Sequence, residues 1–142
     1  NVDNSFKVSG LEFMSEYKFS NKFRITSNLT FTKVEENLNL RIPEFKINAA
    51  LFYRPSDRVL MSLSYQFNYD RRDVVFNSNT FSNDDVILSK YSLMDFYISQ
   101  KFIKNKVMVF FNLSNLFNAN YEELYGYSTR GRNAQLGMNI NF

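Results

Sequence analysis

Side chains suited to binding a small molecule lie together near the end of the chain. Tyr125, Tyr127 and Arg130 fall within the segment YEELYGYSTRGR. Tyrosine rings and a guanidinium group are stiff, so they contact a bound molecule at a low cost in conformational entropy. The same side chains could instead brace their loop against a neighbouring strand. The segment therefore predicts a ligand contact, with a structural role as the alternative.

The chain has few of the residue types that catalyse reactions or bind metal ions. The chain has no Cys and no His, which removes thiolate nucleophiles, disulfides, histidine bases and most zinc sites. Ser and carboxylates are plentiful, but no oxyanion motif or glycine-rich phosphate loop accompanies them. We therefore expect no enzyme, no catalytic residue and no cofactor. A net charge of +3 is too small to favour nucleic acid as a partner.

The polar segment 70–90 carries the remaining charged candidates. Asp84 and Asp85 lack the regular spacing of oxygen ligands that a Ca²⁺ site needs, so no metal is expected there. Arg71 and Arg72 open the motif RRD, in which we expect the charges to compensate one another rather than to bind an anionic ligand. The segment is interpreted as a solvated loop.

The segments between these loops are expected to be β-strands, which hold the loops in position. Apolar and polar residues alternate along most of the chain, and helical periodicity is hard to find. In LEFMSEYKF, for example, Leu11, Phe13 and Tyr17 share one face. VMVFFNL is too uniformly apolar to show its facing, but Val107, Val109, Phe111 and Leu113 are expected to face together. About seven strands are expected, over residues 11–19, 23–31, 41–53, 59–69, 91–102, 107–113 and 133–142.

Strand length and loop alternation both favour a transmembrane barrel. The apolar rows run for about nine to eleven residues, the length of a tilted strand that crosses a bilayer. Connections alternate between short and long, as in outer-membrane barrels with short periplasmic turns and long extracellular loops. The short ones are 20–22, 54–58 and 103–106, and the long ones are 33–41, 70–90 and 114–132. Seven strands cannot close a barrel with satisfied edges, so residues 1–142 are expected to be the C-terminal part of a larger one.

Most of the chain resembles a known family, through the strand entries VSGLEF and RIPEFKINAALFY and above all through its last residues. An Asn115-Leu116-Phe117 motif is followed by Tyr121, by the pair Gly131-Arg132, and by an amphipathic strand that ends at Phe142. This pattern resembles the C-terminus of TonB-dependent outer-membrane receptors, of the siderophore and cobalamin type. The resemblance implies a 22-stranded barrel in the bacterial outer membrane, filled by an N-terminal plug domain that precedes the present chain.

The resemblance also implies function and partners. Such receptors take up scarce ligands (iron-siderophores, haem or cobalamin) with energy from the TonB complex. The closing row Leu136, Met138, Ile140 and Phe142 is expected to be a signal read by the barrel-assembly machinery. The alternative is that Phe142 only anchors a lipid-facing strand at the membrane interface.

Two other functions share part of this pattern. A passive porin has the same strand periodicity but should lack the Asn-Leu-Phe, Gly-Arg and terminal Phe combination. A soluble lipocalin-like barrel that binds a small ligand should place its apolar residues inward and needs no outer aromatic band. A plug domain upstream of residue 1 would favour the receptor over the porin, and a detergent-free monomer would favour the lipocalin-like barrel.

Overall fold

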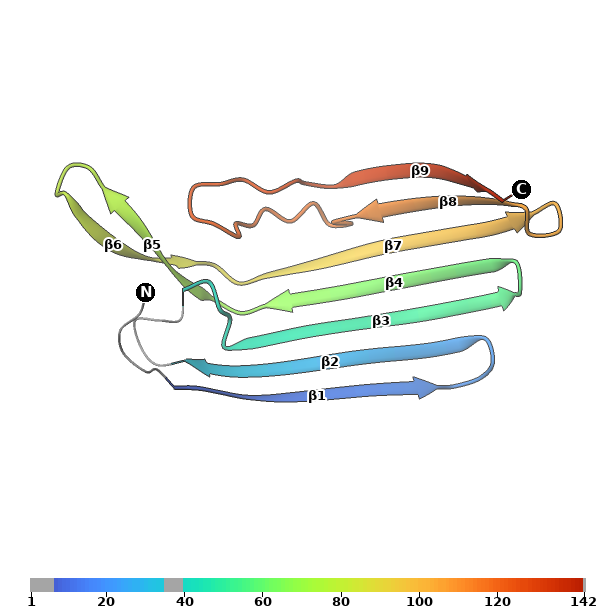
Figure 1. The fold of residues 1–142 in the computed structure, drawn as a ribbon, viewed down its shortest axis with the longest axis horizontal. Helices are drawn as coiled ribbons and strands as arrows, with labels where there is room; N and C mark the ends of the chain where they lie inside the picture. The colour runs from blue at the N-terminus through green and yellow to red at the C-terminus, as the bar shows by residue number, and fades with distance from the viewer. Residues whose placement is uncertain (1–6, 35–39, 142) are drawn as a thin grey trace.

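The chain forms one curved antiparallel sheet with a separate hairpin at one end (Figure 1). The computed structural model describes residues 7–34 and 40–141. The sheet has seven strands in the order β1-β2-β3-β4-β7-β8-β9, and β5 pairs only with β6. The strands of the described residues are β1 (Val8–Lys18), β2 (Phe23–Val34), β3 (Phe45–Ser56), β4 (Val59–Asn68), β5 (Arg71–Asn77), β6 (Ser82–Leu88), β7 (Tyr91–Phe102), β8 (Val107–Ser114) and β9 (Asn133–Ile140).

The seven expected strands are confirmed, but the interpretation of residues 70–90 as a solvated loop was wrong. They contain the β5–β6 hairpin, in which Val75 lies opposite Asp84 and Val74 opposite Asp85. A second correction concerns the connection 54–58. β3 continues through Pro55 to Ser56, and the register shifts between Tyr53 and Ser56. A bulge tolerates a proline because its amide is not needed in the hydrogen-bond ladder.

Register places most of the apolar residues of the seven sheet strands on one face, with exceptions such as Phe52 and Phe110. Phe13 lies opposite Leu29, Leu29 opposite Ile47, and Ile47 opposite Phe67. Further along the sheet, Phe111 lies opposite both Ile98 and Leu136, which confirms the expected facing of β8. Directly opposed residues share a face, and one apolar row crosses all seven strands from β1 to β9: Tyr17, Ile25, Leu51, Leu63, Phe96, Leu113 and Ala134.

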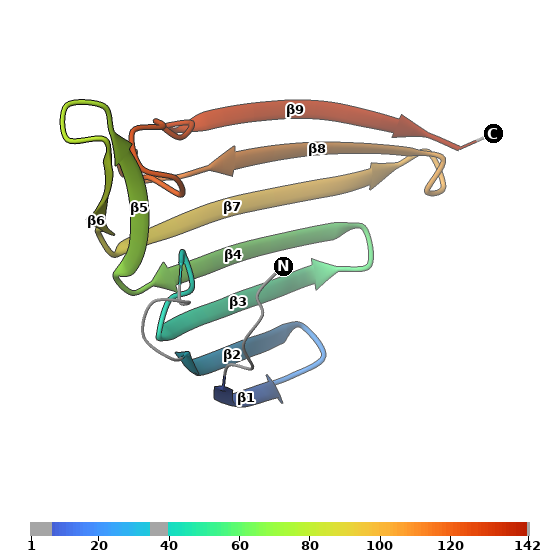
Figure 2. The ribbon, with the colours of Figure 1, turned by 60° about the vertical axis from the view of Figure 1, so that its left-hand side comes forward.

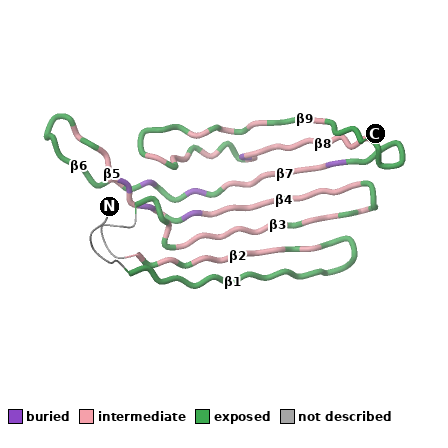
Figure 3. Tube along the Cα trace, in the orientation of Figure 1, coloured by how far each residue is buried: buried purple, intermediate pink, exposed green. Residues whose placement is uncertain are grey.

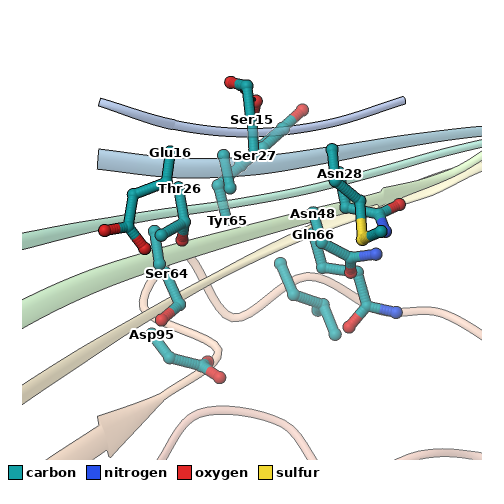
Figure 4. Close-up of a pocket in the computed structure, with 14 residues that line it drawn as sticks. Ser15, Glu16, Thr26, Ser27, Asn28, Asn48, Ser64, Tyr65, Gln66 and Asp95 are labelled. Carbon is teal, nitrogen blue, oxygen red and sulfur yellow. Dashed lines mark hydrogen bonds between the residues drawn. The ribbon is translucent and has the colours of Figure 1, made fainter. Parts of the chain in front are cut away.

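The opposite face is polar and hollowed. A pocket of about 550 Å³ lies on it (Figure 4). Most of its lining residues have the parity of the polar face, and they include Glu16, Thr26, Asn28, Asn48, Ser64, Gln66 and Asp95. The sheet therefore curves around its polar side, and Figure 2 shows the curvature from a second direction.

The connections separate by length at the two ends of the sheet (Figure 1). The β1–β2, β3–β4 and β7–β8 turns lie at one end. The β5–β6 hairpin and the connection 115–132 lie at the other, which we call the long-connection end. Aromatic pairs mark both ends of the apolar face: Phe23 stacks on Tyr53 at 4.2 Å near the short turns, and Phe31 stacks on Phe45 at 4.7 Å near the long connections.

Burial follows the single-layer architecture. Of the described residues, those that are buried lie mainly at the long-connection end (Figure 3). They are Asn68, Arg71, Asp73, Leu88, Tyr91 and Asn115, with Ser99 towards the other end. β1 is exposed along its whole length, and in the described part of the chain β1 and β9 are the two edges of the sheet. Among the described residues, no helix is long and apolar enough to cross a membrane.

Gly137 in β9 gives the first prediction, because the Phe110 ring of β8 covers it. A Cβ atom at position 137 would lie 2.3 Å from Cζ of Phe110. Gly137→Ala must displace that ring and is expected to destabilise the folded protein by about 1–3 kcal/mol, the usual cost of overpacking. Chemical unfolding of the detergent-solubilised full-length protein measures this change. In the double variant F110L/G137A most of the loss should be recovered, and equal losses with and without the Phe110 ring would contradict the close approach.

Candidate functional site

Asp73 lies where the three long connections meet. Its side chain is fully buried, with 0% exposure, although it carries a carboxylate. Oδ1 accepts hydrogen bonds from Nε of Arg41 at 2.8 Å and from the amide of Val74 at 2.9 Å. Oδ2 accepts one from the amide of Tyr125 at 3.0 Å. Arg41 follows β2, Asp73 lies in the hairpin and Tyr125 precedes β9, so one carboxylate joins all three connections.

The ionisation of Asp73 follows from these contacts. Burial acts to raise the pKa of the Asp73 carboxyl, because it removes water from the charged form. The amides of Tyr125 and Val74 and the guanidinium of Arg41 act in the opposite direction, and together they hold the pKa below its ordinary value of 3.8. A lowered pKa stabilises the fold above the ordinary value, and this stabilisation is lost as the pH falls through the lowered pKa.

A second cluster, beside Asp73, joins the hairpin to the last connection. Nη2 of the buried Arg71 donates a hydrogen bond to the Glu122 carbonyl at 2.8 Å. The Arg71 guanidinium lies 4.9 Å from the centre of the Tyr91 ring, which in turn lies 4.3 Å from the Tyr121 ring. The Tyr91 hydroxyl donates to Oε1 of Glu123 at 3.4 Å. Nε of Arg71 has no hydrogen-bond partner among the described residues.

The three charges of RRD have partners outside the motif. Arg72 pairs with Asp85 across the hairpin. Arg71, however, is satisfied by a carbonyl and an aromatic ring, and Asp73 by partners outside the hairpin. The motif is therefore mainly a junction between connections, which the expectation of mutual compensation missed.

The Asn-Leu-Phe motif makes a tight turn after β8. Asn115 is buried with a φ of 52°, a left-handed conformation that Asn tolerates better than most residues. Its amide donates to Oδ1 of Asp95, and its side chain bonds both the amide and the carbonyl of Ala119. A residue with a longer or apolar side chain could not make all of these contacts.

Gly131 and Arg132 belong to the same structural unit. The Arg132 amide donates to Oδ1 of Asn118 at 2.8 Å. A Cβ atom at position 131 would lie 2.7 Å from that oxygen, so a side chain there would displace Asn118. These contacts order the last connection around Asn118.

The three residues expected to contact a ligand lie on that ordered connection. Tyr125 and Tyr127 expose 46% and 67% of their surface, and Arg130 is also exposed. Gly126, with a φ of 77°, lies between the two tyrosines. The Tyr125 amide is held by Asp73 while its ring is exposed, so its backbone braces the cluster and its side chain is available.

A pocket of about 330 Å³ opens between the hairpin and the last connection. Its walls carry hydroxyl, amide and ammonium groups with one aliphatic side chain, from Ile87, Ser89, Lys90, Asn120, Tyr121, Glu122, Ser128 and Thr129. Such a wall offers hydrogen bonds to a polar ligand. Among the described residues, no group of three or more His, Cys, Asp or Glu could hold a metal ion.

The predicted assembly row lies on the apolar face of the edge strand β9. Leu136, Met138 and Ile140 are exposed and lie opposite Phe111, Val109 and Val107 of β8. Phe142, the last member of the row, lies outside the described residues. The pattern places apolar side chains outward along an edge strand that has a partner on one side only.

An apolar outer face, a polar concave face and long connections at one end define a segment of a transmembrane β-barrel. No family model matches the chain. Solved structures of TonB-dependent siderophore receptors share its fold.

Three of these receptors illustrate the likeness. The ferripyoverdine receptor of the Pseudomonas aeruginosa outer membrane gives a TM-score of 0.77 at 13% identity, over 92% of this chain and 19% of that one. The ferric-catecholate import receptor Fiu of E. coli K12 gives 0.76 at 16% identity, over 95% and 21%. The siderophore receptor PirA of Acinetobacter baumannii gives 0.76 at 17% identity, over 92% and 21%. The chain thus spans about a fifth of the length of these receptors.

Proposed function

We propose that the chain is the C-terminal part of the barrel of an outer-membrane receptor that imports ferric siderophores with energy from the TonB complex. The observation that carries the proposal is the fold likeness to siderophore receptors over 92–95% of the chain. The Asn115 turn and the Gly131-Arg132 pair support the same family, because both belong to the sequence motif that resembles its C-terminus. Both also hold the last connection in place through hydrogen bonds. Haem and cobalamin are the other ligand classes that the sequence resemblance implies.

The partners follow from the geometry of the sheet. The edges β1 and β9 need hydrogen-bond partners in lipid, which the remaining barrel strands would supply. The apolar face would contact membrane lipid, and the polar concave wall of Figure 4 would face a plug domain. The long-connection end would then be extracellular and the short turns periplasmic.

Uptake by iron-limited cells tests the proposal. Cells in which the full-length protein is the sole candidate receptor should take up a ferric siderophore, and loss of the TonB complex should abolish uptake. Haem and cobalamin are tested in parallel. Uptake that is independent of the TonB complex, together with steady ion conductance in a planar bilayer, would instead support a passive porin.

Ligand contact by the exposed side chains of the last connection is the second prediction. Tyr125→Ala, Tyr127→Ala and Arg130→Ala should each raise the Kd of the imported ligand by about tenfold, the loss typical of an exposed aromatic or arginine contact. Binding to the detergent-solubilised full-length receptor measures this change. Tyr17→Ala is the matched control, because Tyr17 is an exposed tyrosine in β1, near the short turns. Unchanged affinity in all three variants would assign these side chains a bracing role.

A further inference from the structure

The three long connections are joined through β5. Arg41 donates its Nε to Asp73 and its amide to the Arg72 carbonyl, and both acceptors belong to β5. On the other side, the Tyr125 amide donates to Asp73 and the Glu122 carbonyl accepts from Arg71. The first and last long connections therefore both form hydrogen bonds with β5.

The central group of this junction is a buried charge. Asp73 has no exposure, and its donors come from residues 32 and 52 positions away as well as from the adjacent amide. A buried carboxylate that loses a donor cannot turn to water for a replacement, so the rest of the cluster must rearrange to solvate it. A disturbance of the first long connection, which carries Arg41, should consequently reach the last long connection, which carries Tyr125.

We propose that Asp73 is a positioning residue that couples the first and last long connections, and that it thereby holds the segment bearing Tyr125 and Tyr127 in one arrangement. The Asp73 carboxylate fixes the Tyr125 backbone, and Gly126 and Tyr127 follow directly. The Tyr127 amide donates to the Leu124 carbonyl at 3.1 Å, so the two tyrosines belong to one local turn. Preorganised aromatic side chains bind at a lower entropic cost than mobile ones.

That the positioned surface meets a ligand rests on the function proposed above, whereas the coupling itself does not. The two can be separated, because the coupling is measured without any ligand. Hydrogen exchange of the full-length receptor in detergent, followed by mass spectrometry, reports each connection and each barrel strand separately.

The decisive variant is Arg41→Gln. The Arg41 side chain is 49% exposed, so its replacement is compatible with folding. The hydrogen bonds of Arg41 go to Asp73 and Arg72 of β5, yet we expect amide exchange in residues 121–127 to accelerate by about tenfold, because Asp73 loses its charged donor. Asp73→Asn should accelerate exchange in both residues 40–44 and 121–127. Arg58→Gln, at an exposed arginine of the β3–β4 turn, is the matched control and should change neither segment.

Two outcomes would overturn the coupling. In the first, Arg41→Gln accelerates exchange in residues 40–44 but leaves residues 121–127 unchanged. In the second, the sheet strands loosen as much as the connections, which would make Asp73 a general stability determinant. If Asp73→Asn fails to assemble, Arg41→Gln alone still decides between these results. A hydrogen-exchange result without coupling would not argue against the proposed import function. Likewise, absence of import would not argue against the coupling.

Discussion

An arginine at position 63 is expected to destabilise the folded barrel by about 2–4 kcal/mol, whereas an arginine at the adjacent position 64 is expected to be tolerated. Leu63 lies near the middle of β4, opposite Leu51 and Phe96, on the apolar face. A cation there would have to be buried in the bilayer core. Ser64 lies on the polar face, opposite Ala50 and Asp95, so an arginine there gains a carboxylate across the strand pair.

Unfolding of the full-length protein from lipid vesicles by guanidinium chloride measures the difference. The two variants add the same side chain to neighbouring positions of one strand, so each controls for the other. A larger loss for Ser64→Arg than for Leu63→Arg would mean that the polar face, and not the apolar face, is the one buried away from water, which would contradict the account. Equal losses would contradict any two-faced account of the sheet.

Removal of Phe142 is expected to sharply reduce the amount of full-length protein assembled in the outer membrane. The row Leu136, Met138 and Ile140 leads to this residue along β9, and the row is exposed on an edge strand. If the row is a signal, its loss should impair assembly in cells but leave spontaneous folding into lipid vesicles unchanged. Fractionation of membranes from cells measures the first quantity, and protease resistance after refolding measures the second.

Phe142→Tyr is the matched control, because it keeps an aromatic ring at the chain end. Normal assembly of the Phe142 deletion in cells would remove the signal hypothesis. Equal losses in cells and in vesicles would favour the alternative, in which Phe142 only anchors the strand at the interface.

The sheet could be predicted from the sequence because its determinant is local. In β1 and β2 most of the apolar residues share one parity, as Leu11, Phe13 and Tyr17 do in β1, and this parity assigns the face. The uniform segment of β8 had no such spacing, yet the expected facing of Val107 and Phe111 was correct, because both lie opposite apolar residues of β9.

The hairpin and the Asp73 cluster could not be predicted in the same way. In β5 and β6 the alternation is obscured, since Val75 lies opposite Asp84 and Val74 opposite Asp85. The role of Asp73 depends on Arg41 and Tyr125, which are distant along the chain and obey no period. The only available signal was that RRD places an acid beside two bases in an otherwise polar segment.

Site-specific labelling in intact cells tests the central claim, a membrane-spanning barrel with its long connections outside. The chain has no Cys, so a single cysteine can be placed at Ser78 in the hairpin turn or at Asp57 in the β3–β4 turn. Both positions are exposed. A membrane-impermeant maleimide should label Ser78→Cys in intact cells and Asp57→Cys only after the outer membrane is permeabilised. Equal labelling of the two variants in intact cells, or labelling of Asp57→Cys alone, would contradict the account.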